Sequence, residues 1–450
     1  MTTRLRATLM WCATAIALVA IAVWPWYVRS AERAAPAVAL PAAAPVTKDY
    51  LDRDRLIAFW ERAEREHRRG DMLSPSNLSA QYMQRYRERG DIGDVERALD
   101  QARRALRAQP WGNVPAEVGL GSALLALHRF TDALAVTRHV ETLVPGDRAT
   151  LVREASLDVE LGRYDDARRI LDRLARRGES GIDVAEETLR ARFEELTGRL
   201  GAARARMRRV SAFVDAQYDG SAQGRAWFAM REGELAFEAG DDAAAIGFER
   251  DALATFPDYS EANRVLARVT CAQRDWHACL AAATASAAVV PYPEVLGAEV
   301  DAQRGLGDAA GAARTDALIR TIERIGNAEH VSDRLLAIYY DEHDERLADA
   351  YRIARRELSV RDDVFTEDTL AWAAAKRGRW AEARLRSRRA VRLGTENSLL
   401  QYHAGVIAQH EGDRGEAMRR LRLALALNAQ FHAAYAPDAR ARLASLGAPR

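Results

Sequence analysis

The stretch Gly378–Gln430, GRWAEARLRSRRAVRLGTENSLLQYHAGVIAQHEGDRGEAMRRLRLALALNAQ, contains one short pattern written twice. The first copy runs from Gly378 to Ala383 and the second from Gly412 to Ala417, so the final alanines are 34 residues apart (417 − 383). A fixed period of this length predicts stacked helical hairpins, because each hairpin buries its apolar face only against a neighbour. The chain is therefore expected to be an array of repeats rather than one globular core.

The final alanine of the pattern marks a repeat along most of the chain. Marks at intervals of 33 to 42 residues are Ala98, Ala133, Ala167, Ala203, Ala245, Cys279, Ala312, Ala348, Ala383 and Ala417. A proline, which a helix interior excludes, stands twelve residues after four of them, at Pro110, Pro145, Pro257 and Pro291. A hydrophobic content of 48% with only 7% aromatic residues suits closely packed helices. Both kinds of mark thus predict an all-α array in one register.

This unit resembles the tetratricopeptide repeat (TPR) family, whose 34-residue hairpins carry a small residue in the first helix, an aromatic near the turn, Ala in the second helix and Pro at the end. The resemblance covers residues 77–430 and implies a right-handed superhelical solenoid of about ten hairpins. Residues 49–76 are expected to form an N-terminal capping helix, and residues 431–450 a C-terminal cap or tail. The longest interval between marks predicts an irregular insert at about 208–223, which lengthens a helix or adds a loop.

An apolar run without charge at residues 7–28 precedes the repeats. A helix of this length spans a hydrocarbon core of about 30 Å, and Trp24 and Trp26 stand at its far end, where aromatic rings favour the membrane interface. We expect residues 1–30 to form a signal anchor, or transmembrane helix, that contacts the membrane. The Ala- and Pro-rich residues 31–48 are then a linker, since proline disfavours a regular helix.

A short amino terminus ahead of a long translocated domain predicts a single-pass protein of the inner (cytoplasmic) membrane, with the solenoid outside the cytoplasm. Cleavage between Val28 and Ser30 would instead release the solenoid into the periplasm. A bridge between Cys271 and Cys279 would suit an exported protein. The repeat register does not place these two cysteines opposite each other, which favours two small buried residues instead.

The charge of the chain argues against a nucleic-acid partner. The formal net charge is +1, and the arginines alternate with Asp and Glu along the helices. A nucleic-acid surface needs a clustered excess of positive charge. This pattern is typical of a solvated protein surface.

Three patterns in the sequence resemble sites of chemistry, and each is better explained as a helix turn or as packing. Gly305-Leu-Gly307 outlines a dinucleotide loop, but no strand precedes it. The acidic turn Asp341–Glu345 could gather a cation, yet it lacks partner ligands at helical spacing. His403 and His410 lie seven residues apart with no metal-ligand spacing around them. We therefore expect no catalytic residue, no cofactor and no metal.

In TPR proteins resembling this chain, the first helix of each hairpin faces a concave groove. Counting back from the marks selects the residues that would contact a partner there: Trp227, Met230, Glu234, Phe237, Glu238, Arg264, Arg268, Tyr340, Asp341, Phe365, Trp372 and Tyr402. Mixed aromatic, Met and charged residues are typical of protein-recognition surfaces. Each aromatic serves equally well as packing between neighbouring hairpins, and Arg264 and Arg268 either grip a partner's carboxylate or pair with Glu261.

The segments Thr369–Ala373 and Tyr402–Val406 are also similar to bacterial membrane-anchored TPR proteins. The leading hypothesis is a non-enzymatic, membrane-tethered scaffold of the bacterial envelope that binds a segment of another protein. An accessory or assembly subunit of a membrane transport, secretion or envelope-biogenesis complex is the alternative. An enzyme with an unrecognised site is weaker still, because no spacing predicts converging catalytic residues.

Overall fold

A computed structural model describes residues 46–448 except 68–69, 179–180, 218 and 329–333. The expected membrane helix at residues 7–28 lies outside this part of the chain. Within the described part, no helix is both long and apolar enough to cross a membrane.

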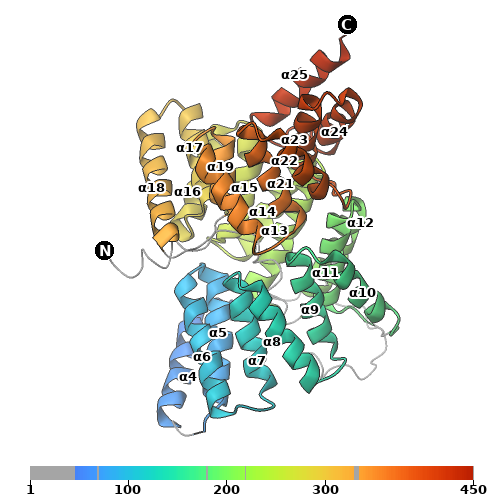
Figure 1. Cartoon of the computed structure of the whole chain (residues 1–450). Coiled ribbons are helices and arrows are strands. Elements are labelled where there is room, and N and C mark those ends of the chain that lie inside the picture. The colour runs from blue at the N-terminus through green and yellow to red at the C-terminus, as the bar shows by residue number, and fades with distance from the viewer. Residues whose placement is uncertain (1–45, 68–69, 179–180, 218, 329–333, 449–450) are drawn as a thin grey trace. The chain divides into compact units, whose positions relative to one another are not determined.

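The described residues form 22 α-helices and one short 3-10 helix, arranged as successive antiparallel pairs (Figure 1). The first helices are η1 Asp49–Leu51, α4 Arg53–Glu66, α5 Leu73–Arg89, α6 Ile92–Ala108, α7 Val114–Ala126, α8 Phe130–Leu143, α9 Arg148–Glu160, α10 Tyr164–Ala175, α11 Val184–Leu196, α12 Leu200–Asp215 and α13 Ala222–Glu238. The later ones are α14 Asp242–Thr255, α15 Ser260–Ala272, α16 Trp276–Val289, α17 Pro293–Gly305, α18 Ala309–Ala328, α19 Arg334–Glu342, α20 Leu347–Leu358, α21 Val364–Lys376, α22 Trp380–Ala390, α23 Ser398–His410, α24 Arg414–Leu427 and α25 Tyr435–Gly447. The described part of the chain is therefore all-α and is built of successive helical hairpins.

The described chain divides into two compact units. The N-terminal unit comprises residues 46–190 and 206–227, and the C-terminal unit comprises residues 191–205 and 228–448. Helices α11, α12 and α13 each contribute residues to both units. The predicted partner-binding residues lie in the C-terminal unit, except Trp227.

The Gly-Asp pairs of the sequence build the hairpin turns. Gly240 and Gly412 have φ of +73° and +80°, a left-handed conformation that glycine adopts without a steric penalty. The aspartate that follows caps the second helix: the Asp413 carboxylate accepts a hydrogen bond from the Glu416 N–H at 3.0 Å. The repeated pattern thus specifies where one helix ends and the next begins.

The alanine marks lie at helix contacts, with one correction. Nine of the ten predicted marks are buried, with exposed fractions of 0 to 4%. The mark at Ala348 is wrong, because this side chain is exposed and Ala350 is the buried alanine of α20. The error arises because α18, at 20 residues, is longer than the other helices of the described array, so a fixed period miscounts the next unit. Near the predicted insert, α12 and α13 are lengthened to 16 and 17 residues.

The cysteine pair is the second correction. Cys271 lies in the last turn of α15 and Cys279 in the first turn of α16, and the two form a disulfide with a Cα–Cα distance of 5.0 Å. The register argument against this bridge fails because the tight turn between the helices brings these two positions face to face. The bond therefore links the two helices of one hairpin across the turn between them.

Hydrogen bonds within the C-terminal unit join residues that are nearly 200 positions apart in the sequence. The hydroxyl of Thr395, before α23, donates to the Leu196 carbonyl at 2.6 Å, and the Leu200 N–H donates to the Glu396 carboxylate at 2.8 Å. Further along, the Asn428 side chain donates to the Phe237 carbonyl at 2.7 Å. Loops after α22 and α24 are thus bonded to the ends of α11 and α13.

Candidate functional site

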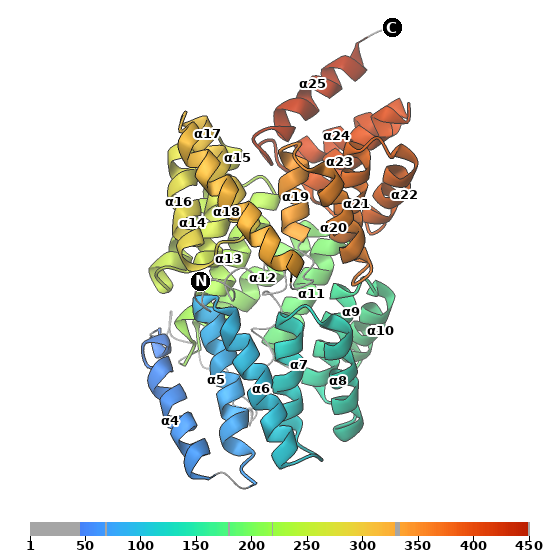
Figure 2. The same ribbon diagram turned by 60° about the vertical axis from the view of Figure 1, so that its left-hand side comes forward.

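The first helices of successive hairpins lie side by side in the C-terminal unit. Helices α15, α17, α19, α21 and α23 pack against one another in that order, and Figure 2 shows α19, α21 and α23 as neighbours. Because these helices meet directly, residues at equivalent positions along them form continuous strips. These helices, with α11 and α13 before them, are called the inner helices here.

The predicted aromatic residues are buried between the hairpins. Trp227, Phe237 and Tyr340 have exposed fractions of 1%, Tyr402 of 2% and Trp372 of 7%. Met230 is also buried, whereas Phe365 is half-buried with the Arg192 guanidinium 5.4 Å from its ring centroid. These rings therefore contribute to packing within the structure.

Four of the five predicted charged residues come together with two neighbours, Glu195 and Arg231. They form an arginine–glutamate strip that consists of Glu195, Arg231, Glu234, Glu238, Arg264 and Arg268. Arg231 pairs with Glu195 at 2.9 Å and with Glu234. Arg264 pairs with Glu234 at 2.7 Å and with Glu261 at 2.9 Å, and Arg268 pairs with Glu238 at 2.7 Å. Each arginine thus joins one inner helix to the one before it.

The arginine–glutamate strip is electrostatically balanced. Burial opposes the ionised form of Glu234, but the Arg231 and Arg264 guanidiniums outweigh it and lower the pKa of Glu234 to about 2. Charge-assisted hydrogen bonds of this kind are among the stronger polar contacts in proteins. The charged side chains of this strip therefore pair with one another.

A second strip, the acid–aromatic strip, lies on α19 to α25 and consists of Asp341, Asp368, Trp372, Tyr402, His403 and Tyr435. Its rings contact one another: Trp372 lies 5.8 Å from Tyr402 and 4.2 Å from His403, and Tyr402 stacks on Tyr435 at 4.8 Å between ring centroids. The Asp368 carboxylate bonds to His403 Nδ1 at 2.9 Å. Four helices, α19, α21, α23 and α25, thus contribute to one cluster of rings and carboxylates.

Asp341 is the exception in this strip. It is 1% exposed, and neither carboxylate oxygen has a hydrogen-bond partner among the described residues. Burial raises the pKa of Asp341 to about 8, against the attraction of Lys376 and with the repulsion of neighbouring acids. His403 Nε2 also has no hydrogen-bond partner in the described part of the chain. The acid–aromatic strip is therefore electrostatically incomplete, unlike the arginine–glutamate strip.

More exposed ionisable groups border the acid–aromatic strip. His343 Nε2 lies 3.0 Å from the Asp301 carboxylate, and His432 Nε2 lies 3.7 Å from Glu342. Burial raises the pKa of Glu342 to about 7 and lowers that of His432 to about 4. Asp301 is 40% exposed at its side chain, so this border reaches solvent.

Counting from the marks selected Asp341, Trp372 and Tyr402 but missed three members of the strip. His403 follows Tyr402 directly, and Asp368 lies one helical turn before Trp372, so helical spacing could have added both. Tyr435 belongs to the segment expected to be only a cap, and no repeat register reaches it.

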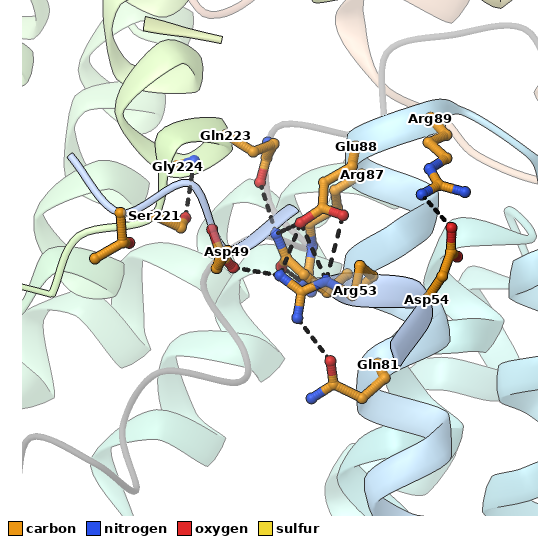
Figure 3. Close-up of polar contacts among 12 residues, drawn as sticks. Asp49, Arg53, Asp54, Gln81, Arg87, Glu88, Arg89, Ser221, Gln223 and Gly224 are labelled. Carbon is orange, nitrogen blue, oxygen red and sulfur yellow. Dashed lines mark hydrogen bonds and ion pairs between the residues drawn. The ribbon is translucent and has the colours of Figure 1, made fainter. Parts of the chain in front are cut away.

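A buried polar cluster in the N-terminal unit is centred on Arg53 (Figure 3). Arg53 is 4% exposed and donates to Glu88 at 2.8 Å and to Gln81 at 2.6 Å, and it also pairs with Asp49. This cluster joins η1 and α4 to α5. Because Arg53 pairs with residues of the same unit, the role of the cluster is to hold these helices together.

The sequence patterns that resemble sites of chemistry have packing roles in the structure. Gly305 ends α17, where a Cβ atom would lie 2.5 Å from the Trp276 ring, so close helix packing requires a residue without a side chain. His410 stacks on Trp380. Across the described residues, no group of three or more His, Cys, Asp or Glu side chains is placed to hold a metal ion.

Comparison with known proteins gives structural neighbours alone. No protein-family model and no curated protein sequence matches the chain. Similar solved structures are human IFIT1 in a dimer with m7Gppp-AAAA (13% identity, 77% of this chain and 88% of that chain, TM-score 0.42) and the APC/C hetero-tetramer Cut9–Hcn1 (12%, 89% and 94%, 0.33). Yeast Tom70 matches with 12% identity over 89% of this chain and 94% of that chain, at a TM-score of 0.34. These neighbours are TPR-like solenoid proteins, and at such low similarity they add nothing to the argument for function.

Proposed function

We propose that this protein is a non-enzymatic scaffold that binds a segment of another protein on the inner helices of its C-terminal unit. The observation that carries the proposal is the contrast between the two strips. The arginine–glutamate strip satisfies its own charges, whereas Asp341 of the acid–aromatic strip is buried without a hydrogen-bond partner among the described residues. A partner on this face would meet the groups at the border of the acid–aromatic strip that reach solvent, such as Asp301.

The proposal also includes how the protein is attached to the membrane and on which side of it the solenoid lies. Residues 7–28 would anchor the protein in a bacterial inner membrane, with the solenoid on the outer side. The Cys271–Cys279 disulfide supports this location, because such bonds persist in oxidising compartments and are rare in the cytosol. A phosphatase fused to the carboxyl terminus should be active in intact cells, and an inactive but stable fusion would contradict the location.

The binding face can be tested without disturbing the core. A photo-crosslinking amino acid would replace Asp301 on inner helix α17, whose side chain is 40% exposed. As a control it would replace Leu318, an exposed residue on the second helix α18. We expect a discrete crosslinked protein from position 301 and none from position 318 in the native envelope. Equal products from both positions, or none from position 301, would contradict binding on the inner helices.

A further inference from the structure

The loops that connect successive hairpins lie at one edge of the N-terminal unit. Because successive helices run antiparallel, the carboxyl ends of α4, α6, α8 and α10 lie at the same end of the hairpins, and each leads into the helix that follows (Figure 2). Two of these loops are bonded together, since Arg177 after α10 donates to the Gly146 carbonyl after α8 at 2.7 Å. This surface is called the loop edge here and consists of the described residues within 65–73, 103–113, 138–147 and 172–183.

The loop edge exposes large apolar side chains to solvent. Four of them are 36 to 78% exposed, namely Leu73, Trp111, Val144 and Ile182. The C-terminal unit differs at the position directly after the second helix of a hairpin, where Val144 stands after α8. There Phe256 after α14 and Val290 after α16 are only 5% and 3% exposed. A row of exposed apolar side chains at one edge indicates a surface that contacts something less polar than water.

Exposed arginines surround these apolar side chains. The carboxyl ends of helices favour cations, and the ends of α4, α6 and α10 place in solvent Arg65, Arg103, Arg107, Arg173, Arg176 and Arg177. The exposed acids of the described loop edge are Glu66 and Asp172. This edge therefore carries a local excess of positive charge, although the formal net charge of the whole chain is only +1.

The other acidic residues of the loop edge are held by backbone groups. Asp71, Asp147 and Asp183 each accept a hydrogen bond at 2.9 Å from an N–H group in the first turn of the following helix. Glu141 accepts one from the Gly146 N–H at 3.0 Å. Caps of this kind direct the carboxylates toward the helix starts, whereas the arginines extend from the helix ends into solvent.

The proposed membrane segment joins the chain at this same unit. The Thr47 hydroxyl donates to the Gly220 carbonyl in the α12–α13 loop at 3.0 Å, and both residues belong to the N-terminal unit. The 17 residues after position 28 and before position 46 (45 − 28) extend to at most about 60 Å. Helix α5 has 17 residues and is about 26 Å long. The tether is therefore long enough for the loop edge to reach the bilayer.

We propose that the loop edge of the N-terminal unit lies on the surface of a bilayer that contains anionic lipid, with Trp111 in the interface and the exposed arginines against the headgroups. This inference rests on the membrane attachment in the proposed function and adds which surface of the protein meets the membrane. Tryptophan favours the bilayer interface, and arginines near an anionic surface strengthen binding. A row of apolar side chains among arginines suits a bilayer, which offers both headgroup charge and hydrocarbon.

The test uses the full-length chain reconstituted in vesicles, with a fluorescent amino acid in place of Val144. Leu306, directly after α17 in the C-terminal unit, is the matched position for the label, because the two side chains are 36% and 37% exposed. With phosphatidylglycerol present, lipids that carry a quencher near the headgroup should quench the label at position 144 at least about twofold more than the label at position 306. In vesicles of phosphatidylcholine alone this difference should shrink, because the anionic surface is missing.

Removing the charges or the ring should release the loop edge from the vesicle. Arg173→Gln/Arg176→Gln should lower the ratio of docked to undocked protein by about fivefold for each arginine removed, and Trp111→Ser should also weaken the quenching. Arg388→Gln/Arg422→Gln is the matched control, because it removes two exposed arginines from α22 and α24, and it should leave the quenching unchanged. Circular dichroism checks that every variant is folded.

The proposal is overturned if both positions are quenched equally, if anionic lipid makes no difference, or if the two double-arginine variants behave alike. A response of the label at position 144 to protein concentration, RNA or soluble envelope proteins, without a response to vesicles, would assign the edge to another partner and also overturn it. Flotation of the vesicles separates this proposal from the attachment. A chain that floats with them but is not quenched at position 144 removes the docking alone, whereas a chain that neither floats nor is quenched removes both.

Discussion

At the scale of single residues, Asp341 shows what counting along a repeat predicts and what it misses. The count began from Ala348, which is two residues away from the buried alanine, yet it still selected neighbours on α19. Tyr340 turns its hydroxyl toward the Glu323 carboxylate at 3.0 Å, within the hairpin packing. Asp341, the next residue, is left without a hydrogen-bond partner among the described residues. The repeat predicts that a residue is on an inner helix, but its partner depends on side chains from other units.

Asp341 also predicts how stability depends on pH. Burial raises its pKa to about 8, with Lys376 opposing and with Glu342, Asp344 and Asp368 reinforcing the shift. The folded state therefore holds a proton that the unfolded state has lost, so stability is full below about pH 4 and declines as pH rises toward about 8. Between pH 5 and pH 8.5 the melting temperature of wild type should fall by at least about 3 °C more than that of Asp341→Asn. Parallel melting curves would contradict a protonated, buried Asp341.

Gly305 gives a residue-scale test of the hairpin packing. A Cβ atom at this position would lie 2.5 Å from the Trp276 ring, so Gly305→Ala forces the ring to move. We expect a loss of about 1–3 kcal/mol in the free energy of unfolding, the usual range for overpacking. Gly247→Ala on α14 is the control, because nothing lies within 4 Å of its added methyl group, and it should be neutral or slightly stabilising. Denaturant unfolding monitored by circular dichroism measures both, and equal stabilities would contradict the contact.

At the scale of elements, the hairpins could be predicted from sequence because their signals are local. A left-handed glycine ends one helix, an aspartate caps the next, and a small residue lies at the contact. Ion pairs between inner helices could not be predicted in this way. Arg264 bonds to Glu261 three residues away, as one alternative proposed, but it bonds equally to Glu234 thirty residues away. That partner depends on how neighbouring hairpins are aligned.

The disulfide between α15 and α16 should stabilise its hairpin. By closing a short loop it restricts the unfolded chain, which is worth about 2 kcal/mol for a loop of this size. The double variant Cys271→Ala/Cys279→Ala should melt at a lower temperature than wild type, and a reducing agent should lower the melting temperature of wild type but not of the variant. The bond would be contradicted if a reducing agent left the melting temperature of wild type unchanged. It would also be contradicted if alkylation detected free thiols in the protein purified from the envelope.

At the scale of the whole molecule, the sequence predicts an array of hairpins but not how the array closes. The Thr395–Leu196 and Asn428–Phe237 bonds join residues 199 and 191 positions apart. Such contacts depend on small rotations between repeats that add up along the solenoid, and no single repeat contains that information. They make the C-terminal unit one compact body, with both strips on its inner helices.

The central claim is that the inner helices of the C-terminal unit hold a segment of a partner protein. Its most direct test is crosslinking in the native envelope from a photoreactive residue at position 301 on α17, with position 318 on α18 as the control. We predict one protein product from position 301 and none from position 318. Equal products from both positions, or none from position 301, would contradict the claim.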